Sequence, residues 1–219
     1  MKRMSDAALK RGFGLPATVT LRLVCAGSLL LSLISACTGQ GTMNPAASAE
    51  SAYTVGVYYY PWYGDDFHGK KYLREHLTPP QPPSLGEYDD RDAAVIAQHL
   101  QWSREANVSL WVASWWGPGR REDTTLRQHI LPHAELGDMK IALFYETSGR
   151  IQGFSDLSNV SSDISYIAAN YLDHPNYLRI DDRPVLFIYL TRVLSSRGVL
   201  AETVDLMRTA ATEAGFEIY

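Results

Sequence analysis

From about residue 53 onward, apolar runs typical of strands alternate with stretches in which apolar residues recur at the helical period. A run of β-branched and aromatic residues over 54–60 predicts a strand. Apolar runs over 109–115, 140–145 and 184–189 predict three more strands, and 216–219 begins a fifth. The run at 184–189 is nearly continuous, which is typical of a strand covered on both faces. The sequence therefore predicts a mostly buried sheet.

Between these runs the apolar residues recur at the helical period, which predicts four helices, over 92–105, 124–136, 162–172 and 201–214. Asp90 or Asp92 can cap the first and Ser161 or Ser162 the third, and Pro132 must kink or shorten the second. The positions that we expect to face the core are Val95, Ile96, His99, Leu100 and Trp102, then Ile164, Ile167, Ala168, Tyr171 and Leu172, and finally Val204, Met207, Ala211 and Ala214.

This alternation of strands and helices is compatible with an open doubly wound sheet or with a (β/α)8 barrel. No glycine-rich dinucleotide fingerprint follows the first strand, which weakens the open-sheet alternative. Residues 53–219 number 167, whereas a barrel of this type usually needs about 250. We expect an α/β fold with the first four βα units of a TIM-type barrel plus the start of strand five. A chain that ends inside an apolar strand also indicates truncation.

The first 36 residues have the pattern of an export signal. Basic residues precede a short apolar core over 23–34, and the core ends in Ile34-Ser35-Ala36-Cys37, which is typical of a bacterial lipoprotein signal. The expectation is cleavage before Cys37, lipidation of its thiol and a stable membrane anchor. The chain would then lie in the cell envelope, on the periplasmic side or at the outer membrane. The Gly-, Pro- and Ser-rich stretch over 37–52 is interpreted as a flexible tether.

Charge and cysteine content narrow the function. The chain has 20 basic and 24 acidic residues, and removing the five basic residues and one acid of the leader leaves 15 against 23. A net charge of −8 argues against nucleic acid and suits a neutral partner. Cys25 leaves with the leader, so Cys37 has no intramolecular partner, and neither a disulfide nor a cysteine metal cluster is expected.

Aromatic residues gather where the predicted strands end, which is where barrels place their sites. Sugars stack their C–H faces on such rings and pair their hydroxyls with carboxylates. We expect Tyr58 and Trp111, inside strands, to be core residues. The side chains that we expect to bind a glycan are Tyr60, Trp62, Tyr63, Trp115, Trp116, Tyr189 and the carboxylate Glu146.

Other polar groups carry weaker signals. His129 and His133 lie four apart, but no third ligand is apparent and Pro132 disturbs the spacing. The pairs Asp65-Asp66 and Asp89-Asp90 lack the spaced oxygens of a calcium loop, and the second pair is expected to cap a helix. We therefore predict no metal and no cofactor.

Several motifs, taken in order, resemble glycoside hydrolase family 99. They are Tyr-Tyr-Pro-Trp-Tyr-Gly over 59–64, Leu-Gly-Glu-Tyr-Asp-Asp-Arg-Asp over 85–92, Ala-Ser-Trp-Trp-Gly-Pro-Gly over 113–119, and Asp-His-Pro over 173–175 before Arg-Pro-Val-Leu-Phe-Ile-Tyr over 183–189. The resemblance implies a (β/α)8 barrel and a retaining, endo-acting mannosidase-like activity that needs no metal. It also implies that the catalytic acids come from the second half of the barrel.

Two positions depart from the family pattern. Glu146 is followed by Thr147 rather than by Pro-Tyr, and Tyr189 is followed by Leu190 rather than by Asp-Ser-Tyr. We expect a carbohydrate-active envelope lipoprotein that binds an oligo- or polysaccharide, with these 219 residues alone inactive and Glu146 a supporting carboxylate. The alternatives are a non-catalytic glycan-binding lipoprotein and a relative that works beside a glycosyltransferase in polysaccharide synthesis.

Overall fold

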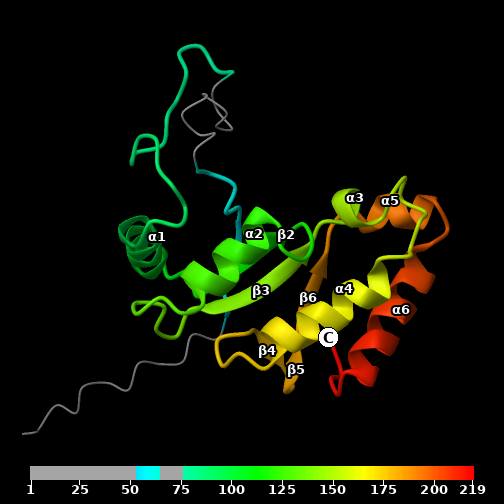
Figure 1. Cartoon of the computed structure of the whole chain (residues 1–219). Coiled ribbons are helices and arrows are strands. Elements are labelled where there is room, and N and C mark those ends of the chain that lie inside the picture. Colours follow the sequence, from blue (N-terminus) through cyan, green and yellow to red (C-terminus); the bar gives the residue numbers. More distant parts are fainter. Residues whose placement is uncertain (1–52, 65–75) are drawn as a thin grey trace, which may run out of the picture. The chain divides into compact units, whose positions relative to one another are not determined.

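A computed structural model describes residues 53–64 and 76–219, and these residues belong to one compact unit. The leader, the tether, Cys37 and the Asp65-Asp66 pair lie outside the described residues. Four parallel strands pair in the order β1, β2, β3, β6, with bounds Gly56–Tyr59, Leu110–Trp115, Lys140–Tyr145 and Leu186–Ile188. Each strand neighbours the next parallel strand along the chain, as in successive βα units of a barrel (Figure 1).

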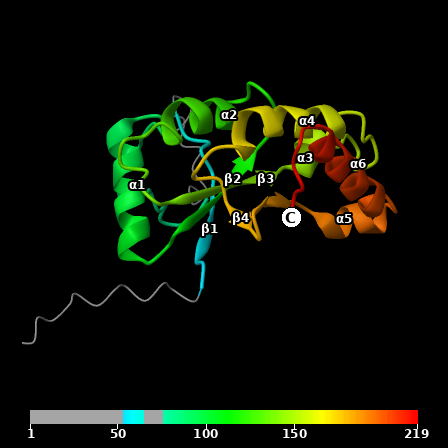
Figure 2. The ribbon, with the colours of Figure 1, turned by 90° about the horizontal axis from the view of Figure 1, so that it is seen from below.

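Helices follow one another around one side of this sheet (Figure 2). Their bounds are Ala93–Glu105 for α1, Arg121–Thr125 for α2, Thr147–Arg150 for α3, Val160–Ile167 for α4, Thr191–Ser196 for α5 and Leu200–Glu213 for α6. Two of them continue as π-helical turns, Leu126–Ile130 after α2 and Ala168–Leu172 after α4. A two-stranded hairpin of β4 (Arg179–Ile180) and β5 (Arg183–Pro184) precedes β6. Among the described residues, none of the helices is both long and apolar enough to cross a membrane.

The two faces of the sheet pack differently because side chains alternate along each strand. On the outer face, Trp111, Ala113 and Trp115 of β2 join the helices in one large buried cluster. On the inner face, a small cluster holds Leu110, Val112, Ala142 and Phe144, with Leu178 and Phe187 partly buried against it. The arrangement is a partial (β/α) barrel, as the alternating pattern predicted, and the inner face corresponds to the barrel interior.

Helix α1 confirms most of its predicted stripe. Ile96 and Leu100 are fully buried, and Asp92 is the N-cap, accepting a 2.8 Å hydrogen bond from the amide of Ala94. Trp102, expected in the core, is instead 41% exposed. It lies two residues after Leu100, about 200° around the helix, so it falls outside the buried stripe.

The second helix differs most from its prediction. It begins at Arg121 rather than at Thr124, because the Asp123 carboxylate accepts the amide of Gly119 at 2.9 Å and closes the preceding turn. The π-helical turn ends at Ile130, before Pro132, which has no N–H for a further helical bond. The shortening at Pro132 was therefore predicted correctly, and the start of the helix was not.

The third helix keeps its predicted buried stripe, since Ile164, Ile167, Ala168, Tyr171 and Leu172 are all buried. Its start was wrong, because Asn159 rather than a serine occupies the N-cap position.

The end of the chain departs modestly from the expected strands. Of the run 184–189, β6 contains only Leu186–Ile188. No strand is assigned over 216–219, yet Tyr219 donates its amide to the carbonyl of Pro184 at 2.8 Å and accepts the amide of Leu186 at 3.4 Å. These two bonds form the parallel pattern with which a fifth strand would begin.

Candidate functional site

The candidate site lies where the strands end on the inner face. Alternation from Val112 places Ser114 and Trp116 on that face at the end of β2, and alternation from Phe144 places Glu146 there after β3. We call the five side chains that gather at this edge the rim: Tyr60, Trp62, Trp116, Glu146 and Tyr189.

Ring contacts join the rim across neighbouring strands. The rings of Tyr60 and Trp62 lie 4.5 Å apart, and those of Trp62 and Trp116 lie 6.3 Å apart in an edge-to-face arrangement. Burial raises the pKa of the Tyr60 hydroxyl, and the nearby groups of Glu146 and Tyr189 raise it further. Tyr60 therefore remains a protonated donor beside an aromatic wall, a combination that suits a sugar ring.

A chain of two hydrogen bonds links the central ring of the rim to its carboxylate. Trp116 donates its indole N–H to the Ser114 hydroxyl at 2.9 Å, and Ser114 donates to Glu146 at 2.7 Å. Glu146 is only 3% exposed, and burial raises the pKa of its carboxyl, although the Ser114 bond opposes that shift. Ser114 thus orients the ring and the carboxylate together.

Two supports fix these rings. A Cβ on Gly149 of α3 would overlap the Trp116 ring, so the close approach of helix and indole requires glycine there. Arg121 donates to the carbonyl of Tyr63 at 2.6 Å and to the buried Asp90 at 2.7 Å, while Asp90 accepts the Tyr63 amide at 2.7 Å. The loop that carries Trp62 is therefore clamped to α2.

This clamp corrects the expectation for the Asp89-Asp90 pair. Asp92 caps α1, whereas Asp90 lies 2% exposed against Arg121 and the loop after β1. Burial raises the pKa of Asp90, and Arg121 partly offsets that rise. The pair is thus a loop anchor rather than a helix cap.

Trp115 is the clearest correction among the predicted binding residues. Its side chain is completely buried in the outer-face core, and its indole N–H donates to Asp123 at 3.2 Å. A ring without exposed surface cannot stack on a glycan, so the prediction for Trp115 was wrong. Sequence order alone placed it beside Trp116, but strand alternation sends the two rings to opposite faces.

Tyr63 and Tyr58 also differ from the simplest picture. The ring of Tyr63 contacts Tyr88, 5.7 Å away, which in turn contacts His99 of α1, so Tyr63 lies toward that helix rather than in the rim. Tyr58, expected in the core, is 58% exposed on the inner face, where its ring lies 4.7 Å from Phe144. Trp111 is buried as predicted.

The position that departs from the family pattern after Glu146 has a structural partner. The Thr147 side chain is fully buried, and its hydroxyl donates to the carbonyl of Tyr189 at 2.8 Å. The amide of Tyr189 donates to the carbonyl of Tyr145 at 3.1 Å. These bonds hold the end of β6 against the end of β3, which places Tyr189 beside Glu146.

Sequence reasoning missed three polar residues of this region, Ser114, Arg121 and Glu122. Ser114 could have been found as a lone polar residue in an otherwise apolar strand. Burial raises the pKa of Glu122, and the charge of Glu122 is among the causes that raise the pKa of Glu146. Arg121 and Glu122 carried no sequence signal, because only the fold brings α2 to the end of β1.

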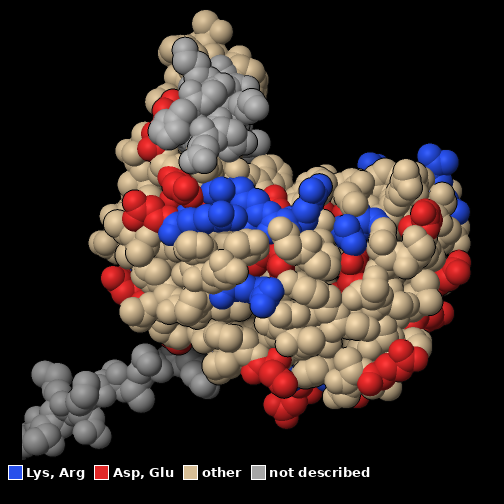
Figure 3. Space-filling model, in the orientation of Figure 1, with Lys and Arg blue, Asp and Glu red and all other residues tan. Residues whose placement is uncertain are grey.

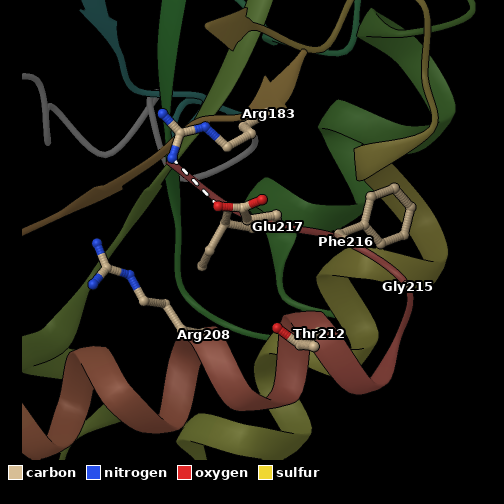
Figure 4. A pocket seen from close by; sticks show the side chains of 7 residues that line it. Arg183, Arg208, Thr212, Gly215, Phe216 and Glu217 are labelled. Carbon is tan, nitrogen blue, oxygen red and sulfur yellow. Dashed lines mark ion pairs between the residues drawn. The ribbon is translucent and has the colours of Figure 1, made fainter. Parts of the chain in front are cut away.

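Another hollow lies away from the rim. It measures about 800 Å³ and is lined by Arg183, Arg208, Thr212 and residues 215–218, beside α6 (Figure 4). Glu217 forms a 3.6 Å ion pair with Arg183 inside it. This hollow adjoins the amino-terminal end of β6, whereas barrels place their chemistry at the carboxyl ends. The rim, which lies at the carboxyl ends of the strands, is therefore the better candidate.

Of the two discounted histidines, His133 has an ordinary polar partner. His133 contacts the carbonyl of Ala93 through Nε2 at 3.0 Å, and His129 lies on the π-helical turn after α2. Within 53–64 and 76–219, no group of three or more His, Cys, Asp or Glu residues is placed to hold a metal ion.

Comparison with known proteins agrees with the motifs of the rim. The model of "Glycosyl hydrolase family 99" matches residues 52–203, which contain every rim residue. The chain belongs to this family.

Two relatives have similar sequences. Glycoprotein endo-alpha-1,2-mannosidase of Mus musculus is 27% identical over 172 residues, covering 63% of this chain and 36% of its own length. A glycoprotein endo-alpha-1,2-mannosidase-like protein of Homo sapiens is 25% identical over 180 residues, covering 66% and 38%. The family-99 chain thus matches less than two fifths of the length of these relatives.

Among solved structures, the chain is similar to the GH99 endo-alpha-mannosidase of Bacteroides thetaiotaomicron in complex with BIS-TRIS-Propane, with a TM-score of 0.48 and 27% identity. The likeness covers 64% of this chain and 42% of that one.

Proposed function

We propose that the rim is a glycan-binding surface of a retaining, endo-acting glycoside hydrolase with mannosidase-like specificity. The observation that carries the proposal is the Trp116–Ser114–Glu146 chain of hydrogen bonds, which presents an aromatic wall and a buried carboxylate side by side at the strand ends. The ring would stack on the C–H face of a sugar, and Glu146 would accept hydrogen bonds from its hydroxyls. The names of the relatives suggest an α-linked mannose substrate.

Binding and cleavage can be separated in this chain. Glycoside hydrolysis needs two carboxyl groups placed across the scissile bond, whereas the five rim residues include one, Glu146. We therefore propose that these 219 residues bind glycan without cutting it. A non-catalytic glycan-binding protein is the second candidate, and the single rim carboxylate favours it.

The test measures binding and turnover on the same sample. Titration calorimetry with α-manno-oligosaccharides should show binding that Trp116→Ala abolishes, while product analysis shows no hydrolysis. Trp102→Ala is the matched control, because Trp102 is an exposed tryptophan on α1 whose ring lies against His99 rather than in the rim. If none of these sugars binds, the proposed glycan-binding function is wrong. If the protein hydrolyses them at enzymatic rates, the proposal that these 219 residues bind glycan without cutting it is wrong.

We also propose that Cys37 anchors the chain in the cell envelope. The support is the sequence pattern over 1–37 alone, with basic residues, a short apolar core and small residues before the cysteine. Detergent phase partitioning of the expressed protein should place it in the detergent phase, and Cys37→Ser should move it to the aqueous phase. Equal partitioning of the two proteins would remove the anchor from the proposal.

A further inference from the structure

The segment that carries Glu146 is tied at both ends to one buried carboxylate. Asp163 of α4 is 1% exposed. It accepts a 2.8 Å hydrogen bond from the hydroxyl of Tyr145, which directly precedes Glu146. It also accepts two bonds from the guanidinium of Arg150, from Nε at 2.8 Å and from Nη2 at 2.7 Å. Because the amide of Arg150 donates to the carbonyl of Glu146 at 3.1 Å, the turn over 145–150 is held against α4.

Arg150 also lies against the residue that follows Trp116. Gly117 has a φ of 122°, and a Cβ on it would lie 2.7 Å from Nη1 of Arg150. A side chain at this position would collide with the guanidinium, so the close approach requires glycine. Gly149, beside Arg150 on α3, approaches the Trp116 ring closely in the same way. The short helix α3 therefore contacts both the ring of Trp116 and the backbone next to it.

Several arginines in this part of the molecule pair with buried carboxylates. Basic side chains gather over α2 on the face shown in Figure 3. Arg121 pairs with Asp90 at 2.7 Å, Arg127 with Asp123 at 3.9 Å and Arg150 with Asp163 at 2.7 Å. Of these pairs, the one between Arg150 and Asp163 holds the chain on both sides of the rim carboxylate.

This pair is better suited to fixing a geometry than to adding stability. The cost of removing two charges from water offsets most of their attraction, so a buried ion pair gives little net stability. A bidentate pair does restrict geometry, because the planar guanidinium meets both oxygens of the carboxylate in one orientation. The hydrogen bonds to Asp163 raise the pKa of the Arg150 guanidinium, which therefore stays charged.

We propose that Asp163 and Arg150 are positioning residues that fix Glu146 and Trp116 relative to each other for glycan binding. Neither belongs to the rim. They act through the turn over 145–150, which carries Glu146, and through the contacts of α3 with the Trp116 segment. The proposal rests on the proposed function, because it concerns the geometry of the same rim.

The test separates a change in the geometry of the rim from a loss of stability. Arg150→Lys keeps the charge but lacks the planar fork that binds both oxygens of Asp163. Affinity for α-manno-oligosaccharides should fall by about tenfold, the size expected when a contact to a ring or to a charged group is misplaced.

Tyr177→Phe is the matched control. The buried Tyr177 hydroxyl accepts the amide of Leu143 at 3.3 Å and donates to the carbonyl of Val185 at 3.0 Å, within the sheet rather than at its rim. This variant should lose free energy of unfolding in urea and keep its glycan affinity.

A second measurement needs no ligand. In ¹H–¹⁵N spectra, the indole N–H signal of Trp116, which donates to Ser114, should shift in Arg150→Lys. The signal of Trp111, which donates to Ser103 at 2.9 Å, should stay in place. Tyr145→Phe removes one of the three bonds to Asp163 and should shift the Trp116 signal less. This milder variant keeps the test available if Arg150→Lys does not fold.

The outcomes distinguish the two proposals. Unchanged affinity in Arg150→Lys, or an equal loss in Tyr177→Phe, overturns the positioning role and leaves glycan binding by the rim intact. A Trp116 signal that stays in place in both variants also overturns it. If the unaltered protein binds no α-manno-oligosaccharide, the proposed function is wrong. The Trp116 signal then decides alone whether Asp163 and Arg150 fix the ring, since a shift supports this and its absence contradicts it.

Discussion

Trp115 and Trp116 are neighbours in the sequence and opposites in the structure. The ring of Trp115 is buried in the outer-face core, while Trp116 is half-buried at the rim of the inner face. Each indole N–H leads to a carboxylate, directly to Asp123 for Trp115 and through Ser114 to Glu146 for Trp116. An indole ring and a carboxylate therefore stabilise the fold on one face and, as we propose, bind a glycan on the other.

What distinguishes the two carboxylates is how many donors surround them. Asp123, 1% exposed, accepts hydrogen bonds from Trp115, the amide of Gly119 and the hydroxyls of Tyr166 and Tyr171. Glu146, 3% exposed, accepts one hydrogen bond from the residues that the structure describes, and its donor is Ser114. A carboxylate has about four acceptor positions. Those of Asp123 are filled by the fold, whereas Glu146 keeps capacity for a ligand.

Removing the outer-face ring should produce the largest effect. Trp115→Ala leaves a cavity in the core and an unfilled acceptor on Asp123, so we expect the free energy of unfolding to fall by about 3–5 kcal/mol. Trp116→Ala should cost less than half as much stability and remove glycan binding. Urea unfolding and calorimetry on both variants measure the contrast. Similar losses in the free energy of unfolding for the two variants would contradict the assignment of a structural role to Trp115 and a binding role to Trp116.

Asp123→Asn should follow in size. The amide keeps one oxygen and replaces the other with an NH2 donor, which faces the indole N–H of Trp115 if it takes the place of Oδ1 and the amide N–H of Gly119 if it takes the place of Oδ2. An N–H group cannot accept a hydrogen bond, so in either orientation of the amide two donors face each other. We expect a loss of about 2–3 kcal/mol in the free energy of unfolding. Asp205→Asn on α6 is the surface control, and a loss no greater than in that control contradicts the structural role.

The sequence predicted the periodic elements well and the polar connections poorly. Strand 140–145 and the buried face of the third predicted helix matched the structure. Both are marked by long periodic runs of apolar residues, whose positions are determined mainly by burial. Trp115 was misplaced because a motif shows which residues are adjacent but not which face each one takes. The clamp of Asp90, Tyr63 and Arg121 joins residues 27 to 58 positions apart, and no local pattern encodes such a pairing.

Gly149→Ala tests whether the orientation of Trp116 matters, with the ring itself retained. The new methyl group would overlap the indole and displace it from Ser114. We expect glycan affinity to drop by about tenfold, or about 1.4 kcal/mol, while stability changes by less than about 1 kcal/mol because alanine favours the helix more than glycine does. Ser148→Ala, exposed on the same short helix, is the control. Unchanged affinity in Gly149→Ala would show that the ring position is unimportant.

Glu146→Gln gives the smallest effect and separates the two carboxylates by its pH dependence. Burial raises the pKa of Glu146 above its usual 4.5, so the folded state holds the proton more tightly than the unfolded state does. The stability that this proton contributes is complete below pH 4.5 and is lost as the pH rises through the pKa of the folded protein. The glutamine variant lacks this loss. Its free energy of unfolding, relative to the unaltered protein, should therefore increase as the pH rises from roughly 4 to 8. Urea unfolding across this range measures the slope, and Glu202→Gln, at an exposed position on α6, is the control. A flat or falling difference for Glu146→Gln would mean that Glu146 is as fully satisfied by the fold as Asp123 is.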